Sequence, residues 1–136
     1  MKKIFFVHDQ QESPAARENF LEMAGFEVVM MKGSNELYVA LQDEQPSLIL
    51  MDILIEGRNG FEVARELHER LPRRRFPIVL CSRIYRARRF RELALKCGAS
   101  DFILQPIQLD DFLRRVNRVL DEWRPAGSED LERRIA

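Results

Sequence analysis

Two aspartates stand just after short apolar runs, and both carry chemistry that a binding site can use. Asp9 follows residues 4–7 with only His8 between them, and Asp52 follows residues 48–51. Two carboxylates that lie close together repel each other unless a cation sits between them or one takes a proton. Oxygen ligands in a sixfold arrangement favour Mg²⁺ over zinc or copper. The pair therefore predicts a magnesium site if the fold brings these two run ends together.

Two further apolar runs end in hydrogen-bonding groups: Ser82 follows residues 78–81, and Gln105 and Pro106 follow residues 102–104. Each group has a simpler explanation when it is taken alone. An aspartate at the end of a strand often serves only a turn. His8 is most simply a polar residue at a strand end, and a metal ligand only as the minority alternative. The argument for a site rests on several such groups meeting at one edge.

The elements that position these groups are visible in the hydrophobic pattern, where short apolar runs alternate with longer amphipathic stretches. We predict strands at residues 4–7, 26–31, 48–51, 78–81 and 102–104, and helices at residues 14–24, 34–44, 60–71, 86–97 and 110–123. The first helix should begin at a Ser13 cap. It should bury Ala16, Phe20 and Ala24, and the fourth helix should bury Phe90, Leu93, Ala94 and Cys97.

Five strand–helix units in succession predict an α/β fold, a doubly wound (βα)5 three-layer sandwich around a five-stranded parallel sheet. With the flavodoxin-like strand order 2-1-3-4-5, a ligand binds outside the carboxyl ends of the first and third strands. Asp9 and Asp52 belong to those two ends. The topology therefore predicts that the two carboxylates converge.

Length and composition fit one domain and exclude several classes of protein. The chain has 136 residues, and its 22 basic and 22 acidic residues cancel, which excludes a histone-like or a highly charged disordered chain. No apolar run approaches the roughly 20 residues of a membrane span. Cys81 and Cys97 lack metal-type spacing, so we expect reduced thiols in a cytoplasmic protein. The domain should cover residues 1–123, with a linker and a short helical tail at 124–136.

Four segments together resemble the receiver domain of two-component response regulators. FFVHDQ resembles the first strand with its acidic pair, and SLILMDILIEGRNG resembles the segment around the phosphorylated aspartate. FPIVLCS is similar to the fourth strand, and GASDFILQPI to the fifth. The resemblance covers residues 2–123 in the family's order, and it identifies the chain as an atypical receiver.

The resemblance implies a role for several residues. Asp52 would be the phosphoacceptor, and Ser82 and Gln105 would stand beside the phosphoryl group. Ser82 and Phe102 would form the switch, with Phe102 swinging inward on activation. Metal ligands would come from Asp9, Asp52 and the carbonyl of Leu54, and Pro106 would follow a cis peptide bond. The chain would then be a signalling protein and not an enzyme.

Four positions depart from the family's pattern: His8 replaces an acid, Gln105 a lysine, Glu56 a proline and Arg83 a small residue. Because two acids, a neutral histidine and a glutamine keep a formal charge of −2, the attraction for Mg²⁺ is retained. Gln105 weakens phosphoryl binding, since a neutral donor contributes ~0.5–1.5 kcal/mol against ~1.5–3 for a charged one. Arg83 either folds over the site to supply the missing charge or is a solvated loop residue.

Two functions follow from the resemblance and its departures. In the first, a sensor histidine kinase or phosphotransfer protein phosphorylates Asp52 with the help of Mg²⁺. The new state is then relayed through the fourth helix, fifth strand and fifth helix. In the second, the chain is a degenerate receiver that binds a protein partner without phosphorylation.

Nine arginines and no acidic residue lie between residues 70 and 91. They are Arg70, Arg73, Arg74, Arg75, Arg83, Arg86, Arg88, Arg89 and Arg91. We predict that they make one side of the domain basic, so that it suits an acidic protein face, a second copy or nucleic acid. The alternative is a solvated surface. Because no helix-turn-helix or other reader module follows, we expect a downstream protein or a homodimer and not direct DNA binding.

Overall fold

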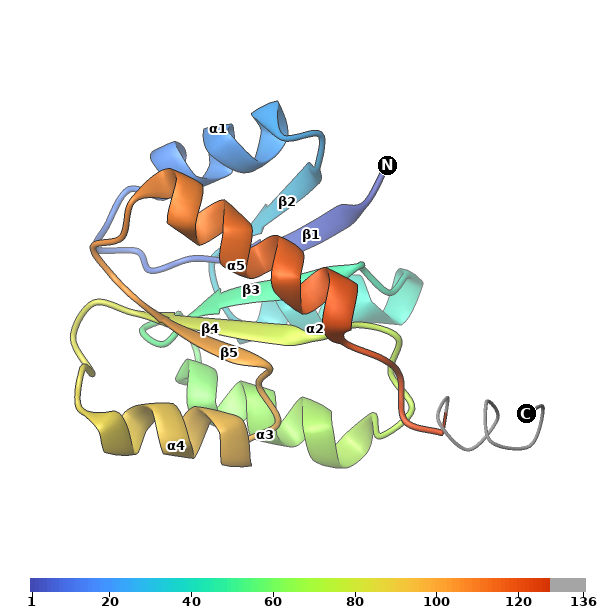
Figure 1. The fold of residues 1–136 in the computed structure, drawn as a ribbon. Coiled ribbons are helices and arrows are strands. Elements are labelled where there is room, and N and C mark those ends of the chain that lie inside the picture. The colour runs from blue at the N-terminus through green and yellow to red at the C-terminus, as the bar shows by residue number, and fades with distance from the viewer. Residues whose placement is uncertain (128–136) are drawn as a thin grey trace.

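Five parallel strands form the centre of the computed structural model, and five helices cover them (Figure 1). Residues 1–127 are described. The strands are β1 (Lys3–Val7), β2 (Glu27–Met31), β3 (Leu48–Asp52), β4 (Ile78–Ser82) and β5 (Asp101–Leu104). The helices are α1 (Ala15–Met23), α2 (Ser34–Asp43), α3 (Gly60–Arg70), α4 (Arg88–Lys96) and α5 (Leu109–Glu122). The sheet order β2-β1-β3-β4-β5 confirms the predicted flavodoxin-like topology.

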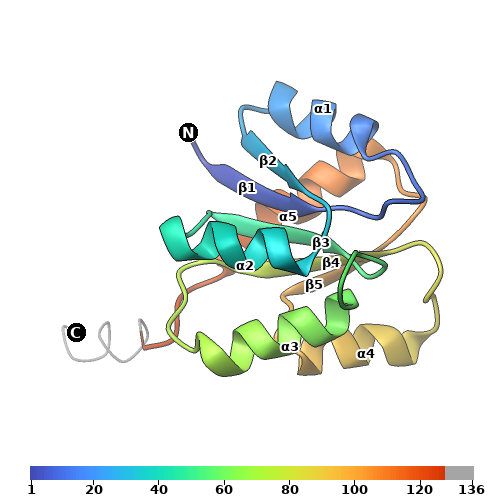
Figure 2. The ribbon, with the colours of Figure 1, turned by 180° about the vertical axis from the view of Figure 1, so that it is seen from behind.

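Alternate residues of each strand serve the two faces of the sheet. In β1, Ile4 and Phe6 pack in the cluster that contains the buried residues of α1 and α5. Phe5 and Val7 pack in the other cluster, with the buried residues of α2, α3 and α4. Figures 1 and 2 show these two layers of helices from opposite sides. The strands are therefore covered on both faces, as a parallel sheet requires.

Helix α1 buries a different face from the predicted one. Ala16 and Ala24 are exposed, whereas Arg17 and Leu21 are buried. An arginine is almost never fully buried unless it is paired, so the apolar pattern alone does not place Arg17 in the core. Arg17 is paired, and the buried face of the helix therefore lies one residue further along the chain than predicted. The helix also begins one residue later than predicted, with Pro14 and not Ser13 at the N-cap. This shift places a charged side chain inside the molecule.

Helix α4 is shorter than predicted, and one of its four expected core residues is wrong. It begins at Arg88, two residues after the predicted start. Ala94 and Cys97 are buried, but Leu93 is exposed. The arginines before and within α4 therefore lie on a loop and on one exposed helix face.

The nine arginines do not form one surface, so the prediction of a single basic side is wrong. Strand β4 separates them, because residues 70–75 precede it and residues 83–91 follow it. The two groups therefore begin at opposite ends of the sheet. Several arginines also have acidic partners, among them Arg70 with Glu66 and Arg91 with Asp101.

The last described helix, α5, ends at Glu122, and residues 123–127 follow it. The tail helix that the sequence predicts at residues 129–135 lies outside the described residues. Within residues 1–127, every helix is too short or too polar to cross a membrane.

Candidate site at the carboxyl ends of β1 and β3

Asp9 and Asp52 meet at the edge that the strand order selects. Asp52 is the last residue of β3, and Asp9 follows β1; both are buried. The backbone N–H of Asp9 donates to Oδ2 of Asp52 at 2.8 Å. Gly60 lies directly behind, where a Cβ atom would approach the backbone oxygen of Asp52 to 2.7 Å. Only glycine fits this close approach, and it lets α3 begin beside the site.

A buried arginine from α1 engages both carboxylate oxygens of Asp52. Arg17 donates from Nη1 to Oδ1 at 2.7 Å and from Nη2 to Oδ2 at 2.9 Å. The two side chains are only 6% and 5% exposed, and the guanidinium also lies over the Phe6 ring. Burial is the largest single influence and would lower the pKa of Arg17, but the hydrogen bonds to Asp52 together with the negative charges around the guanidinium raise that pKa above its ordinary value. Arg17 therefore stays charged.

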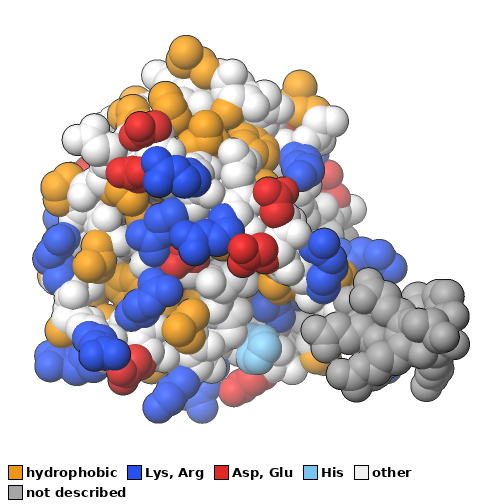
Figure 3. Space-filling model, in the orientation of Figure 1, with side chains coloured by type: hydrophobic (Ala, Val, Ile, Leu, Met, Phe, Trp, Pro, Cys, Tyr) orange, Lys and Arg blue, Asp and Glu red, His pale blue; other side chains and the backbone are white. Residues whose placement is uncertain are grey.

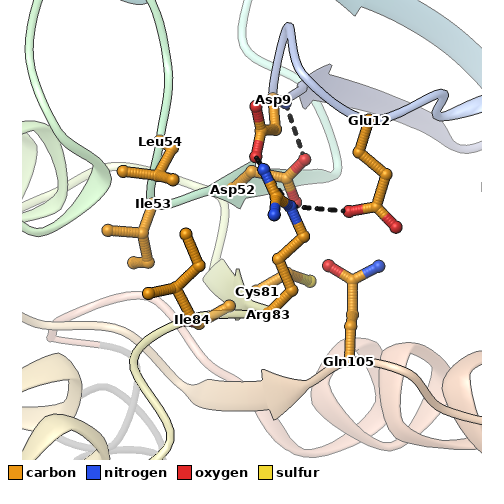
Figure 4. Close-up of a pocket in the computed structure, with 10 residues that line it drawn as sticks. Asp9, Glu12, Asp52, Ile53, Leu54, Cys81, Arg83, Ile84 and Gln105 are labelled. Atoms are coloured by element: carbon orange, nitrogen blue, oxygen red, sulfur yellow. Dashed lines mark hydrogen bonds and ion pairs between the residues drawn. The ribbon is translucent and has the colours of Figure 1, made fainter.

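Arg83 reaches from the loop after β4 and covers Asp9 (Figure 4). Its Nε and Nη2 donate to Oδ2 of Asp9 at 3.0 and 2.8 Å. Oδ1 of Asp9 accepts the backbone N–H of Gln11 at 2.8 Å. The Arg83 side chain is 31% exposed, so this second pair meets water. Arg83 thus folds over the site, but its charge is directed at Asp9.

Glu12 is a third carboxylate at the site, which the sequence did not single out. It lines the same cavity, and Nε of Arg83 lies 3.1 Å from its Oε2 (Figure 4). Three carboxylates and two guanidinium groups leave a formal charge of −1 here, in place of the predicted −2. The sequence contained one indication that Glu12 belongs to the site: it lies only three residues after Asp9, in the short loop between β1 and α1.

Three other predicted residues line the cavity, namely Leu54, Ser82 and Gln105. Oγ of Ser82 accepts the backbone N–H of Tyr85 at 2.8 Å, so this hydroxyl supports the loop after β4. The side chain of Gln105 points toward Glu12 and Arg83 (Figure 4). Gln105 therefore occupies the predicted place, without a positive charge of its own.

Phe102, the predicted switch aromatic, is buried, and Pro106 follows a cis peptide bond. Phe102 is 2% exposed, and its ring centroid lies 6.0 Å from that of Phe61, so it already points inward. The Gln105–Pro106 peptide bond is cis, as the resemblance implied.

His8 and Glu56 are not among the residues that line the cavity. Nδ1 of His8 lies 3.3 Å from the backbone oxygen of Asp9, so the ring stays beside its own chain. Glu56 forms a backbone bridge with Gly33 in the loop before α2. His8 therefore contacts its own loop and Glu56 the loop before α2, whereas the third carboxylate of the cavity is Glu12.

The residues present do not fit a magnesium ion in this arrangement. The oxygens of Asp52 are bound by Arg17 and the N–H of Asp9, and those of Asp9 by Arg83 and the N–H of Gln11. The cavity holds about 10 Å³, roughly one water molecule, whereas Mg²⁺ requires near-octahedral oxygen ligands. Across residues 1–127, no cluster of three acidic, histidine or cysteine side chains could hold a metal ion.

Cys81 also lines the cavity, beneath the two aspartates. Burial, with a smaller contribution from Asp52, raises the pKa of its thiol to about 12. The thiol is therefore protonated at neutral pH and offers no nucleophile. Both Cys81 and Cys97 are free and buried, as the sequence predicts.

Comparisons with known proteins place this geometry in context. The family model described as the response regulator receiver domain matches residues 4–117. The chain is 31% identical over 126 residues to the phosphate regulon transcriptional regulatory protein PhoB of Rhizobium meliloti, covering 92% of this chain and 55% of that relative. The chain thus spans about half the length of this relative.

Two solved structures show the same architecture. A response regulator from Thermotoga maritima is 27% identical, with a TM-score of 0.77 and coverage of 90% of this chain and 99% of that one. The BeF3-activated N-terminal receiver domain of RstA from Klebsiella pneumoniae is 29% identical, also with a TM-score of 0.77, over 87% of this chain and 97% of that one.

Proposed function

This chain belongs to the response regulator receiver domain family, and from that premise we propose that it signals without Mg²⁺-dependent phosphorylation. In this proposal the domain is a protein-interaction module whose acidic site is closed by its own arginines. The observation that carries the proposal is the two-point contact of Arg17 with Asp52. In this proposal the chain is a signalling protein and not an enzyme. The cavity at Asp52, of about 10 Å³, supports this because it has no room for a substrate.

The contact obstructs phosphoryl transfer directly. An Asp52 oxygen would have to attack phosphorus, yet both oxygens already accept hydrogen bonds from a buried guanidinium. Separating a buried ion pair leaves an uncompensated charge, which costs about 3–5 kcal/mol. Gln105 then offers the phosphoryl group only a neutral donor. Both features oppose the reaction.

The surface that we propose for the partner is formed by α4, β5 and α5. These elements are joined at Asp101, which accepts Nε and Nη2 of Arg115 from α5 at 2.9 and 2.7 Å. Nη1 of Arg91 from α4 donates to the same carboxylate at 3.1 Å. Leu95 on α4 is 46% exposed. Figure 3 shows acidic and basic side chains interspersed over this side of the molecule.

A surface of mixed charges with exposed leucine suits a protein partner. Interfaces combine apolar contact with complementary charges, and Arg is enriched in them. We therefore propose a downstream protein or a second copy of this chain as the partner. The cytoplasm is the proposed location.

A second candidate function keeps Asp52 as a phosphoacceptor. It is favoured by the placement of Asp52 at the end of β3, beside Asp9 and in one cavity with Ser82. An Asp52 oxygen would attack the phosphorus of a phosphohistidine on a sensor kinase or phosphotransfer protein, and the histidine would leave. Arg17 would first have to release the carboxylate.

Intact mass after incubation with acetyl phosphate and Mg²⁺ separates the two functions. An Asp52→Asn variant serves as the control, and a receiver that accepts phosphate from this donor is run in parallel. We expect neither wild type nor Asp52→Asn to gain the mass of a phosphoryl group. An added phosphoryl group on wild type that is absent from Asp52→Asn would overturn the proposal and support the second function.

A further inference from the structure

We propose that the Arg17 guanidinium is a resident cation that takes the place of a divalent ion at Asp52. This inference rests on the proposed function, in which the site works without Mg²⁺. It goes further by assigning the loss of the metal to one side chain. Gln105 and His8, the departures visible in the sequence, are then secondary.

The first argument is the geometry of the contact. Two N–H···O bonds of 2.7 and 2.9 Å use one oxygen each, so the same guanidinium binds both oxygens of Asp52. A planar guanidinium matches a carboxylate in this way, and a lysine, as a point charge, would not. Arg17 therefore neutralises Asp52 and holds one acceptor site on each of its oxygens, so that the carboxylate does not need a metal ion for its charge.

The second argument is that Arg17 is held in place. Its guanidinium carbon lies 4.6 Å from the centroid of Phe6, on the sheet face that α1 covers. Leu21, one turn further along α1, is completely buried in the same layer. Withdrawing Arg17 would require α1 to move, because the side chain has almost no exposed surface.

Arg83 completes the arrangement at Asp9, but it is bound less firmly. It contacts Asp9 and Glu12 from a loop, and about a third of its side chain meets water. Water can replace a partly exposed guanidinium, and the N–H of Gln11 still binds Asp9, so the loss of Arg83 does not leave Asp9 without a partner. The loss of Arg17 leaves Asp52 buried and unpaired. Arg17 is therefore the residue that decides whether the site requires a metal ion.

The test is the dependence of thermal stability on Mg²⁺. Ligands that bind only the folded state raise the melting temperature, Tm. We expect saturating MgCl₂ to leave the Tm of wild type where NaCl of equal ionic strength leaves it. Arg17→Met should melt roughly 10 °C or more below wild type without Mg²⁺. Its Tm should then rise with Mg²⁺, because the unpaired Asp52, beside Asp9 and Glu12, gains a cation.

Two further variants make the result specific. Arg17→Met/Asp52→Asn should regain most of the lost Tm and should not respond to Mg²⁺, since no unpaired buried charge is left: Asp9 keeps its pair with Arg83. Arg115→Met is the matched control, because Arg115 also binds a buried aspartate through two N–H···O bonds. It should lower Tm without creating a response to Mg²⁺, since Arg91 still binds Asp101.

The proposal fails if Mg²⁺ stabilises wild type as much as Arg17→Met, or if Arg17→Met shows no response to Mg²⁺. Should Arg17→Met not fold, Arg17→Gln is measured in the same way, and its refolding yield with and without Mg²⁺ gives the same decision. These failures differ from failure of the proposed function, which is an added phosphoryl group on wild-type Asp52. A wild type that neither binds Mg²⁺ nor accepts phosphate keeps the function even if the Arg17 variants do not respond.

Discussion

Two arginine–aspartate pairs with similar contacts lie at opposite ends of the parallel strands, and they differ in how much the fold depends on each. Arg17 and Asp52 meet at the carboxyl end of β3, whereas Arg115 and Asp101 meet at the first residue of β5. Each arginine donates two hydrogen bonds to its aspartate. The side chains of the first pair are 6% and 5% exposed, and those of the second are 27% and 11%.

The number of partners also separates the pairs. Asp101 accepts Arg91 as well as Arg115, and the N–H of Phe102 donates to it at 2.8 Å. Asp52 has one arginine and the N–H of Asp9. If one arginine is lost, Asp101 keeps a second arginine, whereas Asp52 keeps none. Similar contacts therefore differ in their consequences: Asp101 can lose either arginine and stay paired, but Asp52 depends on Arg17 alone.

Arg17→Met should give the largest loss of stability among the substitutions of Arg17, Arg115 and Arg83. We expect the free energy of unfolding to fall by about 3–5 kcal/mol, because Asp52 is left charged and buried. Urea denaturation at neutral pH measures it. A loss below about 1 kcal/mol would show that Asp52 reaches water or another partner.

Arg17→Met/Asp52→Asn sharpens this result through a double-mutant cycle. Removing both charges should restore most of the lost stability, since apolar or neutral replacements of a buried pair are often tolerated. If instead the two losses simply add, the pair carries no coupling, and the contrast with Asp101 disappears.

Arg115→Met should have a smaller effect than Arg17→Met. We expect a loss of about 1.5 kcal/mol, since Arg91 continues to neutralise Asp101 and the pair is partly hydrated. Urea denaturation beside wild type gives the value. A loss equal to that of Arg17→Met would mean that burial does not distinguish the two pairs.

Asp101→Asn should change how stability depends on pH. Burial is the largest single influence and would raise the pKa of Asp101, but the hydrogen bond and charge of Arg115, together with hydrogen bonds from the N–H of Phe102 and from Arg91, hold that pKa below the ordinary 3.8. A depressed pKa adds to the free energy of unfolding at pH values above the ordinary pKa. This contribution is lost as the pH falls through the folded-state pKa. Wild type should therefore lose more stability than Asp101→Asn below about pH 4. Parallel urea midpoints across that range would contradict this.

Arg83→Ala should have the smallest effect on stability, below about 1 kcal/mol, because the Arg83 side chain is partly exposed, so water can take its place, and the N–H of Gln11 still binds Asp9. Thermal melting at low and high salt checks this value. Phosphate uptake by Arg83→Ala, measured by intact mass, should match that of wild type, since Arg17 still holds Asp52. Uptake that appears only in Arg83→Ala would make Arg83 the residue that closes the site.

The positions of the main site residues could be predicted from the sequence, because strand ends are simple to locate. Asp9 and Asp52 each follow an apolar run, and a parallel sheet places such ends at one edge. Ser82 and Gln105 were found by the same reasoning. Topology and the placement of backbone groups therefore follow from local patterns.

The buried cation of the site, Arg17, was harder to predict, because it lies on a helix, α1, whose buried face was assigned by apolar content. Arg17 lies four residues before Leu21, which would have placed both on one helix face. An arginine is rarely chosen as a core residue, so Ala16 and Phe20 were preferred. Two strand-end carboxylates with no lysine nearby were the available signal that a buried cation must come from elsewhere.

The Arg17–Asp52 pair also has a meaning for the history of such a site. Domains are stable by only about 5–15 kcal/mol, so losing 3–5 kcal/mol by changing one partner consumes a large share of the total. A return to an open acidic site through substitution of Arg17 would pass through a poorly folded intermediate unless a metal ion were at hand to stabilise it. Once the pair is in place, substitutions on the surface of the domain therefore cost less stability than a substitution of Arg17 or Asp52, so the closed site is expected to persist while the surface changes.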